Sequence, residues 1–174
     1  MALLLVPLAA CAPLGWGSRR AAGPGFGTPD RSDPALSGDG RLLVSITLEG
    51  DRDTVLLQDA RSGQRLPLPQ LRRQQPHSSP SLSWSGRYLA LLVQQGPRRL
   101  PLVLDRLTGR VIPLPLPGDQ EPLSLSLAPD GRRLALEVVR QGQRRLRVLD
   151  LTPLLEADQP AGLAVTGPGG LNPP

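Results

Sequence analysis

LSGDGRLLVSI at residues 36–46, LSWSGRYLALL at residues 82–92 and LAPDGRRLALE at residues 127–137 are three versions of one stretch. Two sets of landmarks repeat with the same steps of 46 and 45 residues: Gly40, Gly86 and Gly131, and then Asp59, Asp105 and Asp150. Because independent landmarks share one period, we interpret the chain as a repeat array. A period in the mid-forties is typical of propeller blades.

Each copy predicts four short antiparallel strands joined by tight turns. The strands expected in the first copy lie at residues 35–37, 41–48, 53–58 and 64–68, separated by turns that contain Gly and Asp. Pro67 and Pro69 suit an outermost strand, where a backbone N–H needs no partner. The second copy, at residues 80–117, repeats this layout.

The third copy departs from the pattern after Asp150, where the glycine turn is missing. Thr152 followed by Pro153 predicts one helical turn, because these residues suit an N-cap and the first helical position. Residues 163–166 are then expected to supply the last strand. We assign residues 34–166 to the three-blade domain and residues 167–174 to a disordered tail.

The charge of the chain suggests two interpretations. The net charge is +5, and all 20 basic residues are arginine. A basic surface is typical of nucleic-acid binders, whereas arginine without lysine is typical of GC-rich coding. Within the repeats Trp84 and Tyr88 are the only aromatic residues, too few for a base-stacking platform. We therefore expect no nucleic-acid partner.

The N-terminus predicts a lipid anchor. Residues 1–10 are apolar but too short to span a bilayer, which needs about 20 residues. They lead into Leu8-Ala9-Ala10-Cys11, which resembles the lipobox of bacterial lipoprotein signals and makes Cys11 the expected lipidation site. The usual positive residues at the start are missing, so an uncleaved apolar tail is the alternative. Residues 12–33, rich in Gly, Pro, Ala and Ser, are expected to be a flexible linker.

The repeat also resembles a known family. The string P-x-L-S-x-D-G-R-x-L-A, followed by an apolar run ending in Asp and a glycine turn, is similar to the blade repeat of TolB-like propellers. It is found at residues 34–43, 80–90 and, less completely, 125–135, so the resemblance covers about residues 34–151. It implies a periplasmic protein that acts by protein–protein contact at the cell envelope. Such blades also accompany hydrolases, so the resemblance is specific for the fold rather than the activity.

Three blades cannot close a ring, which starts at about four. The middle copy is apolar on both strand faces, which predicts a sheet that is covered on both sides. The outer copies are more one-sided: Arg133 and Glu137 lie on one face of the third, Ser45 and Thr47 on one face of the first. Polar outer faces cap a finite array. We therefore expect an all-β, open array of three blades that is a monomer, with a two-chain, six-blade ring as the alternative.

No candidate catalytic site emerges from the sequence. A Gly-x-Ser-x-Gly elbow is absent, the repeated aspartates are expected to form Asx turns, and Asp51 with Asp53 is too small a set for calcium. His77 is expected to be solvated in a loop between blades. We predict a non-enzymatic envelope binding or scaffold protein with no cofactor and no metal, whose partner is a protein or polymer of the envelope. A fragment or degenerate relative of a propeller-containing hydrolase is the alternative.

Overall fold

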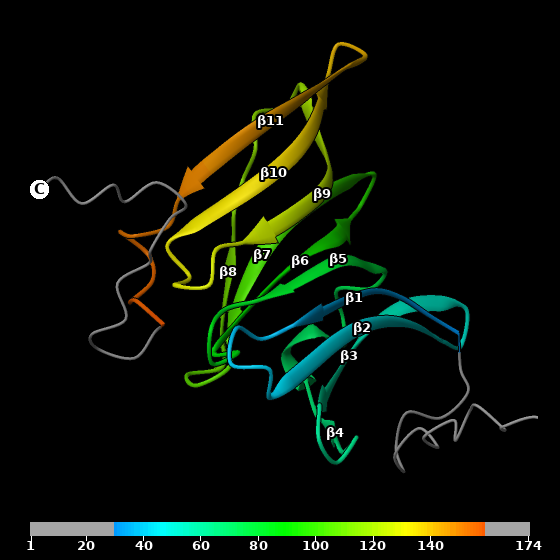
Figure 1. Cartoon of the computed structure of the whole chain (residues 1–174). Helices are drawn as coiled ribbons and strands as arrows, with labels where there is room; N and C mark the ends of the chain where they lie inside the picture. Colours follow the sequence, from blue (N-terminus) through cyan, green and yellow to red (C-terminus); the bar gives the residue numbers. More distant parts are fainter. Residues whose placement is uncertain (1–29, 159–174) are drawn as a thin grey trace, which may run out of the picture.

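The computed structural model describes residues 30–158, which form three antiparallel sheets (Figure 1). The first sheet contains β1 (Arg31–Leu36), β2 (Leu42–Glu49), β3 (Arg52–Asp59) and β4 (Arg65–Leu66). The second contains β5 (His77–Leu82), β6 (Tyr88–Gln95), β7 (Arg98–Asp105) and β8 (Arg110–Pro113). The third contains β9 (Gln120–Leu127), β10 (Arg133–Arg140) and β11 (Gln143–Asp150).

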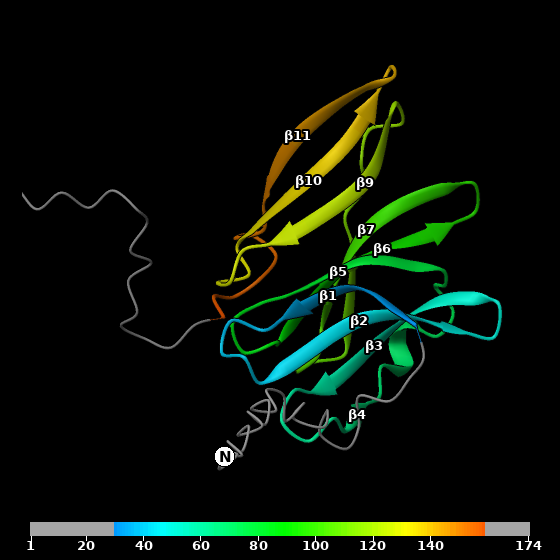
Figure 2. The same ribbon diagram turned by 45° about the vertical axis from the view of Figure 1, so that its right-hand side comes forward.

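The strands of each sheet follow one another in chain order, as in propeller blades. We call the sheets the first, middle and third blade; Figure 2 shows them stacked in sequence order. The predicted all-β fold and open three-blade array are confirmed. Within the described range the helical element is a three-residue 3-10 turn, η1 (Pro69–Leu71), and none is long and apolar enough to cross a membrane. The segments 1–11, 12–29 and 167–174 lie outside the described residues.

The third blade has three strands up to residue 158. After Asp150 the chain makes the single turn predicted there, with the Leu155 N–H donating to the Leu151 carbonyl at 2.9 Å. Leu151 and Leu155 then pack into the core between the middle and third blades. The predicted strand at residues 163–166 lies beyond the described part of the chain.

The first strand begins at Arg31, inside the segment expected to be a linker. The sequence hides this strand because its register shifts between Ser32 and Ala35, where Asp33 has a φ of 48°. The same irregularity recurs in β5 at Ser79, whose φ is 49°. The two bulges touch, because the Ser79 N–H donates to Asp33 Oδ2 at 3.1 Å. They therefore join the innermost strands of adjacent blades.

The middle blade is buried on both faces, as its sequence predicts. Residues 88–93 of β6 are all buried, and alternate side chains enter two different hydrophobic clusters. Tyr88, Ala90 and Leu92 pack toward the third blade, with Leu134 and Leu136. The intervening side chains of β6 pack toward β2 and β3 of the first blade. Two cores on opposite sides of one sheet hold the three blades together.

A row of turns joins the blades at one end. The Asp39 N–H donates to the Trp84 carbonyl (2.9 Å), and the Trp84 N–H donates to the Pro129 carbonyl (2.6 Å). The repeated glycines lie in these turns with φ of +71° or more, as their spacing predicts. A Cβ on Gly131 would lie 2.7 Å from the Tyr88 ring. The three positions therefore need glycine for their backbone conformation, and Gly131 needs it for space as well.

The two end faces of the stack differ from one another. On the third blade Arg133 is exposed and Glu137 partly exposed, as expected. On the first blade Ser45 is buried, although the sequence pattern placed it on a polar outer face, and Gln58 on the same face is buried too. Arg31 contributes to this burial, since its guanidinium crosses the face and donates to Gln58 Oε1. The bulged strand that carries Arg31 was not anticipated at this point of the chain.

Candidate functional site

The repeated aspartates form structural turns, as predicted. Asp59 Oδ1 accepts the backbone N–H groups of Arg61 and Ser62, and Asp39, Asp130 and Asp150 each accept the N–H two residues further on. The hydrogen bonds from Ser62 lower the pKa of Asp59. These carboxylates are consumed by local backbone donors, which supports a role in folding rather than catalysis.

Arg87 links the middle blade to the C-terminal segment. Its guanidinium pairs with Asp105 (3.1 Å) and with Glu156 (2.7 Å), and lies 4.9 Å from the centre of the Tyr88 ring. Burial alone would raise the pKa of Asp105, but the hydrogen bonds from Arg87 and from the Leu107 N–H outweigh it, and the net pKa is lowered. The Glu156 N–H donates to the Tyr88 hydroxyl at 3.1 Å.

Asp158 completes the turn of the middle blade. Its Oδ2 accepts the Ser83 hydroxyl and the Ser85 N–H, and its Oδ1 accepts the Ser85 hydroxyl at 2.6 Å. Asp39 occupies the repeat position of Ser85 in the first blade, and there it accepts the Ser37 hydroxyl. Sequence reasoning missed this role of Asp158. The signal that could have revealed it was serine at position 85, where the other two copies carry aspartate.

Ser83 and Asp158 do not form a nucleophilic triad in the described chain, because no histidine contacts either residue. Ser83 is 0% exposed, and its hydroxyl also accepts the Tyr88 N–H. A serine in this setting is held by its neighbours and lacks the histidine base of such a triad.

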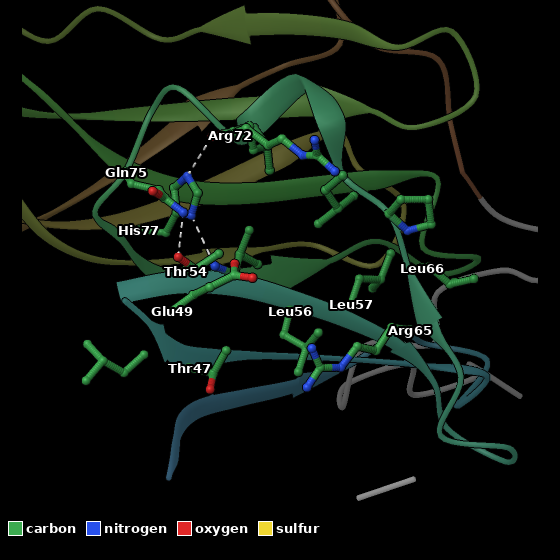
Figure 3. A pocket seen from close by; sticks show the side chains of 15 residues that line it. Thr47, Glu49, Thr54, Leu56, Leu57, Arg65, Leu66, Arg72, Gln75 and His77 are labelled. Atoms are coloured by element: carbon green, nitrogen blue, oxygen red, sulfur yellow. Dashed lines mark hydrogen bonds between the residues drawn. The ribbon is translucent and has the colours of Figure 1, made fainter. Parts of the chain in front are cut away.

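His77 is buried at 2% exposure, so the expectation of a solvated loop residue is wrong. Its Nδ1 accepts the Val55 N–H at 3.1 Å, and its Nε2 lies 3.2 Å from the Leu71 carbonyl (Figure 3). These contacts require a neutral imidazole with the proton on Nε2. Burial lowers the pKa of His77, and the hydrogen bond to Leu71 opposes this only in part.

The reason for this burial lies in the edge of β3. β4 pairs only with Leu57 and Gln58, so the Val55 N–H needs another acceptor, which His77 supplies. The equivalent residue of β7 is Pro101, which has no N–H to satisfy. The imidazole therefore accepts a hydrogen bond from the sheet edge at a point where a longer fourth strand would otherwise pair.

A pocket of about 650 Å³ opens beside this edge. Figure 3 shows that it lies where β3, β4 and the segment around η1 meet. Thr54, Leu57 and His77 line one part of it, and Arg65 and Arg72 lie at its rim. Two of its polar side chains bond to one another, because Gln75 Nε2 donates to Thr54 Oγ1 at 2.6 Å. Its charged side chains are Arg65, Arg72 and Glu49, and the imidazole of His77 is already engaged by backbone groups.

Residues 30–158 contain no group of three or more His, Cys, Asp or Glu side chains that could hold a metal ion. Asp51 and Asp53 are both exposed in and beside the hairpin between β2 and β3. Cys11, the expected lipidation site, lies outside the described residues.

The structure is similar to solved β-propellers. A protein assigned as TolB from Agrobacterium tumefaciens is 18% identical with a TM-score of 0.60, covering 74% of this chain and 46% of that one. TolB from Acinetobacter baumannii is 19% identical with a TM-score of 0.57, and the match covers 70% of this chain and 30% of that one. The β-propeller domain of the Trilobed protease from Pyrococcus furiosus is described as having an open velcro topology. It is 15% identical with a TM-score of 0.55, and the match covers 75% of this chain and 42% of that one.

These likenesses establish the fold, which is that of TolB-like propeller blades. The chain spans less than half the length of each of these structures. No family model matches the sequence, and no curated protein matches it.

Proposed function

We propose that this chain is a non-enzymatic binding or scaffold protein of the bacterial cell envelope, located in the periplasm and held at the membrane by a lipid on Cys11. The observation that carries the non-enzymatic part is the state of the reactive side chains. The one histidine of the chain has both nitrogens engaged by backbone groups, and the repeated aspartates accept backbone N–H groups in turns. The resemblance of the repeats to TolB-like propellers, which implies action by protein–protein contact, supports the binding role.

The anchor is tested by metabolic labelling with a palmitate analogue in a bacterial host. We expect the wild-type chain to carry the label and to fractionate with membranes, and Cys11→Ala to lose both properties. Cys11 is the only cysteine, so no second thiol can obscure the result. Equal labelling of the two proteins would refute the anchor.

A second candidate is a fragment or degenerate relative of a propeller-containing hydrolase. It is favoured by the likeness to a prolyl endopeptidase structure, with 17% identity, a TM-score of 0.54 and 19% of that chain covered. This function needs a nucleophile and a base at one end of the blades. A screen of the purified chain against peptide and glycoside libraries tests it: a hydrolytic activity that His77→Ala abolishes while the fold is retained would replace our proposal.

A further inference from the structure

β11 ends the third blade with an edge that no other strand of residues 30–158 covers. The corresponding edges of β3 and β7 are paired with β4 and β8. Pro67 directly follows β4 and Pro113 ends β8, and proline makes an outer edge unfit for further pairing. Both views place β11 at the margin of the molecule (Figures 1 and 2). The third blade therefore presents eight residues of unblocked edge.

The repeat identifies the backbone groups of β11 that point outward. Val55, Pro101 and Leu146 occupy equivalent positions in the three sheet registers. The Val55 N–H donates outward to His77, and the Pro101 carbonyl accepts outward from the Leu114 N–H at 2.9 Å. Leu146 and the residue two positions on therefore direct their N–H and C=O groups away from the sheet, ready to pair with an extended chain.

One face of this edge is apolar and balanced in charge. Leu146 is 83% exposed and Val148 is 66% exposed. Arg144 shares this face, but its charge is already paired with Glu137 at 3.0 Å. Side chains of an added strand on this face would therefore meet methyl groups rather than an open charge.

The other face of the edge is basic and unneutralised. Arg145 Nη2 donates to Gln143 Oε1 at 3.1 Å, and Arg147 Nη1 donates to Gln120 Oε1 at 2.6 Å. Neither guanidinium forms an ion pair with a carboxylate of the described residues. An added strand with negative side chains opposite these two positive charges would therefore be favoured.

We propose that β11 binds an extended acidic segment of a partner protein by strand addition, with alternate carboxylates facing Arg145 and Arg147 and small apolar side chains beside Leu146 and Val148. This specifies the partner of the proposed binding function, on which it rests. Charge argues against two other occupants. Antiparallel pairing with β11 of a second copy would bring arginines together, and residues 159–174 contain no Asp or Glu.

The test uses the full chain and a fluorescein-labelled, terminally capped octapeptide in which Glu and Val alternate. Binding is followed by fluorescence anisotropy at two salt concentrations. We expect saturable binding that weakens as salt is raised, because the two ion pairs are exposed. Two matched probes isolate the mechanism: a peptide with Lys in place of Glu, and the Glu peptide with alternate amides N-methylated. Both are expected to bind at least about tenfold more weakly, since they lose the charge match and the strand pairing respectively.

Two variants of the chain locate the site. Leu146→Pro removes an outward N–H at a position where the middle blade already has proline, so the sheet should fold, and binding should weaken by about 3- to 10-fold. Arg147→Glu should weaken binding of the Glu peptide and strengthen binding of the Lys peptide. Leu107→Ala, which removes an exposed apolar side chain from a turn of the middle blade, is the control and should leave binding unchanged. Thermal unfolding checks that each variant is folded.

Equal binding of the Glu and Lys peptides would overturn the proposal, as would unchanged binding to folded Leu146→Pro. Binding that emerges only in Val165→Pro would also overturn it, because residues 163–166 would then be the strand that covers β11. If the chain is lipidated at Cys11 but fails these tests, the proposal of an acidic partner segment is refuted. The proposal of a lipid-anchored binding protein is then unaffected.

Discussion

Asp158 supplies to the middle blade, from 73 residues away, the carboxylate that Ser85 lacks. In the first blade Asp39 performs this task within the turn itself, accepting the Ser37 hydroxyl and the Arg41 N–H. The C-terminal segment is thereby fixed across the base of the stack. Residues 151–158 therefore become part of the blade architecture.

Removal of this carboxylate should destabilise the protein. Asp158→Ala leaves the buried Ser83 hydroxyl without its acceptor, and we expect the free energy of unfolding to fall by about 1–3 kcal/mol. Urea denaturation measures the change. Asp119→Asn is the control, because its ion pair with Arg140 is 43% exposed on both sides and should contribute less than about 1 kcal/mol.

Restoring the repeat residue should rescue the defect. Ser85→Asp places a carboxylate at the position that Asp39 occupies in the first blade, so Ser85→Asp with Asp158→Ala should be more stable than Asp158→Ala alone. In the wild-type background Ser85→Asp should instead destabilise, because two carboxylates would share one site. A double variant no more stable than Asp158→Ala would show that the two turns are not equivalent.

His77 should make stability depend on pH near neutrality. Burial lowers its pKa in the folded chain below 6.5, the ordinary value that the unfolded chain retains. The unfolded chain therefore binds the proton more readily, and the contribution of neutral His77 is complete above pH 6.5 and is lost as the pH falls below it. The slope can reach about 1.4 kcal/mol per pH unit for one proton.

Urea midpoints at pH 7.5 and pH 5.5 measure this effect, with His77→Asn as the comparison because its amide oxygen keeps an acceptor near the Nδ1 position. The wild type should lose more stability than the variant when the pH is lowered from 7.5 to 5.5. Asp59, Asp105 and Asp150 do not interfere, since their pKa values are lowered from 3.8 and lie below this pH range. Equal losses in the two proteins would contradict the neutral, buried imidazole.

The glycine turns offer a matched pair of substitutions. Gly40 and Gly131 have φ of 71° and 76°, but a Cβ on Gly40 meets nothing within 4 Å whereas one on Gly131 lies 2.7 Å from the Tyr88 ring. Gly40→Ala should cost about 1 kcal/mol of backbone strain. Gly131→Ala should cost about 1–3 kcal/mol more, because the buried ring must shift. Equal melting temperatures would mean that the blades do not pack as closely as described.

The sequence predicts the blades well because their period, turns and two-faced middle strand are local patterns that recur. Gly86 and Gly131 could be placed in left-handed turns from spacing alone. The misses at His77, Asp158 and Arg31 share another cause. Each residue supplies a hydrogen-bonding group that one copy of the repeat lacks, or adds a contact that the repeat pattern does not contain. Such contacts join residues that are far apart in sequence. They carry no periodic signal, although serine at position 85 marks the place where one was needed.

The end faces bear on whether three blades stand alone. A six-blade ring of two chains would bury Arg133, Glu137 and Arg144 of one copy against the outer face of the first blade, where Thr47 and Thr54 lie. Charged residues are depleted at the core of interfaces, and burying the Arg144–Glu137 pair carries a desolvation cost that its attraction does not reliably offset. We therefore propose that two chains do not close a six-blade ring and that the chain is a monomer.

Light scattering at micromolar concentration on the full chain with Cys11→Ser, which removes the expected lipid, tests this most directly. The open stack predicts the mass of one chain, unchanged across a tenfold range of concentration. A stable particle of two chains that Arg133→Glu dissociates would contradict it and would favour a closed six-blade ring.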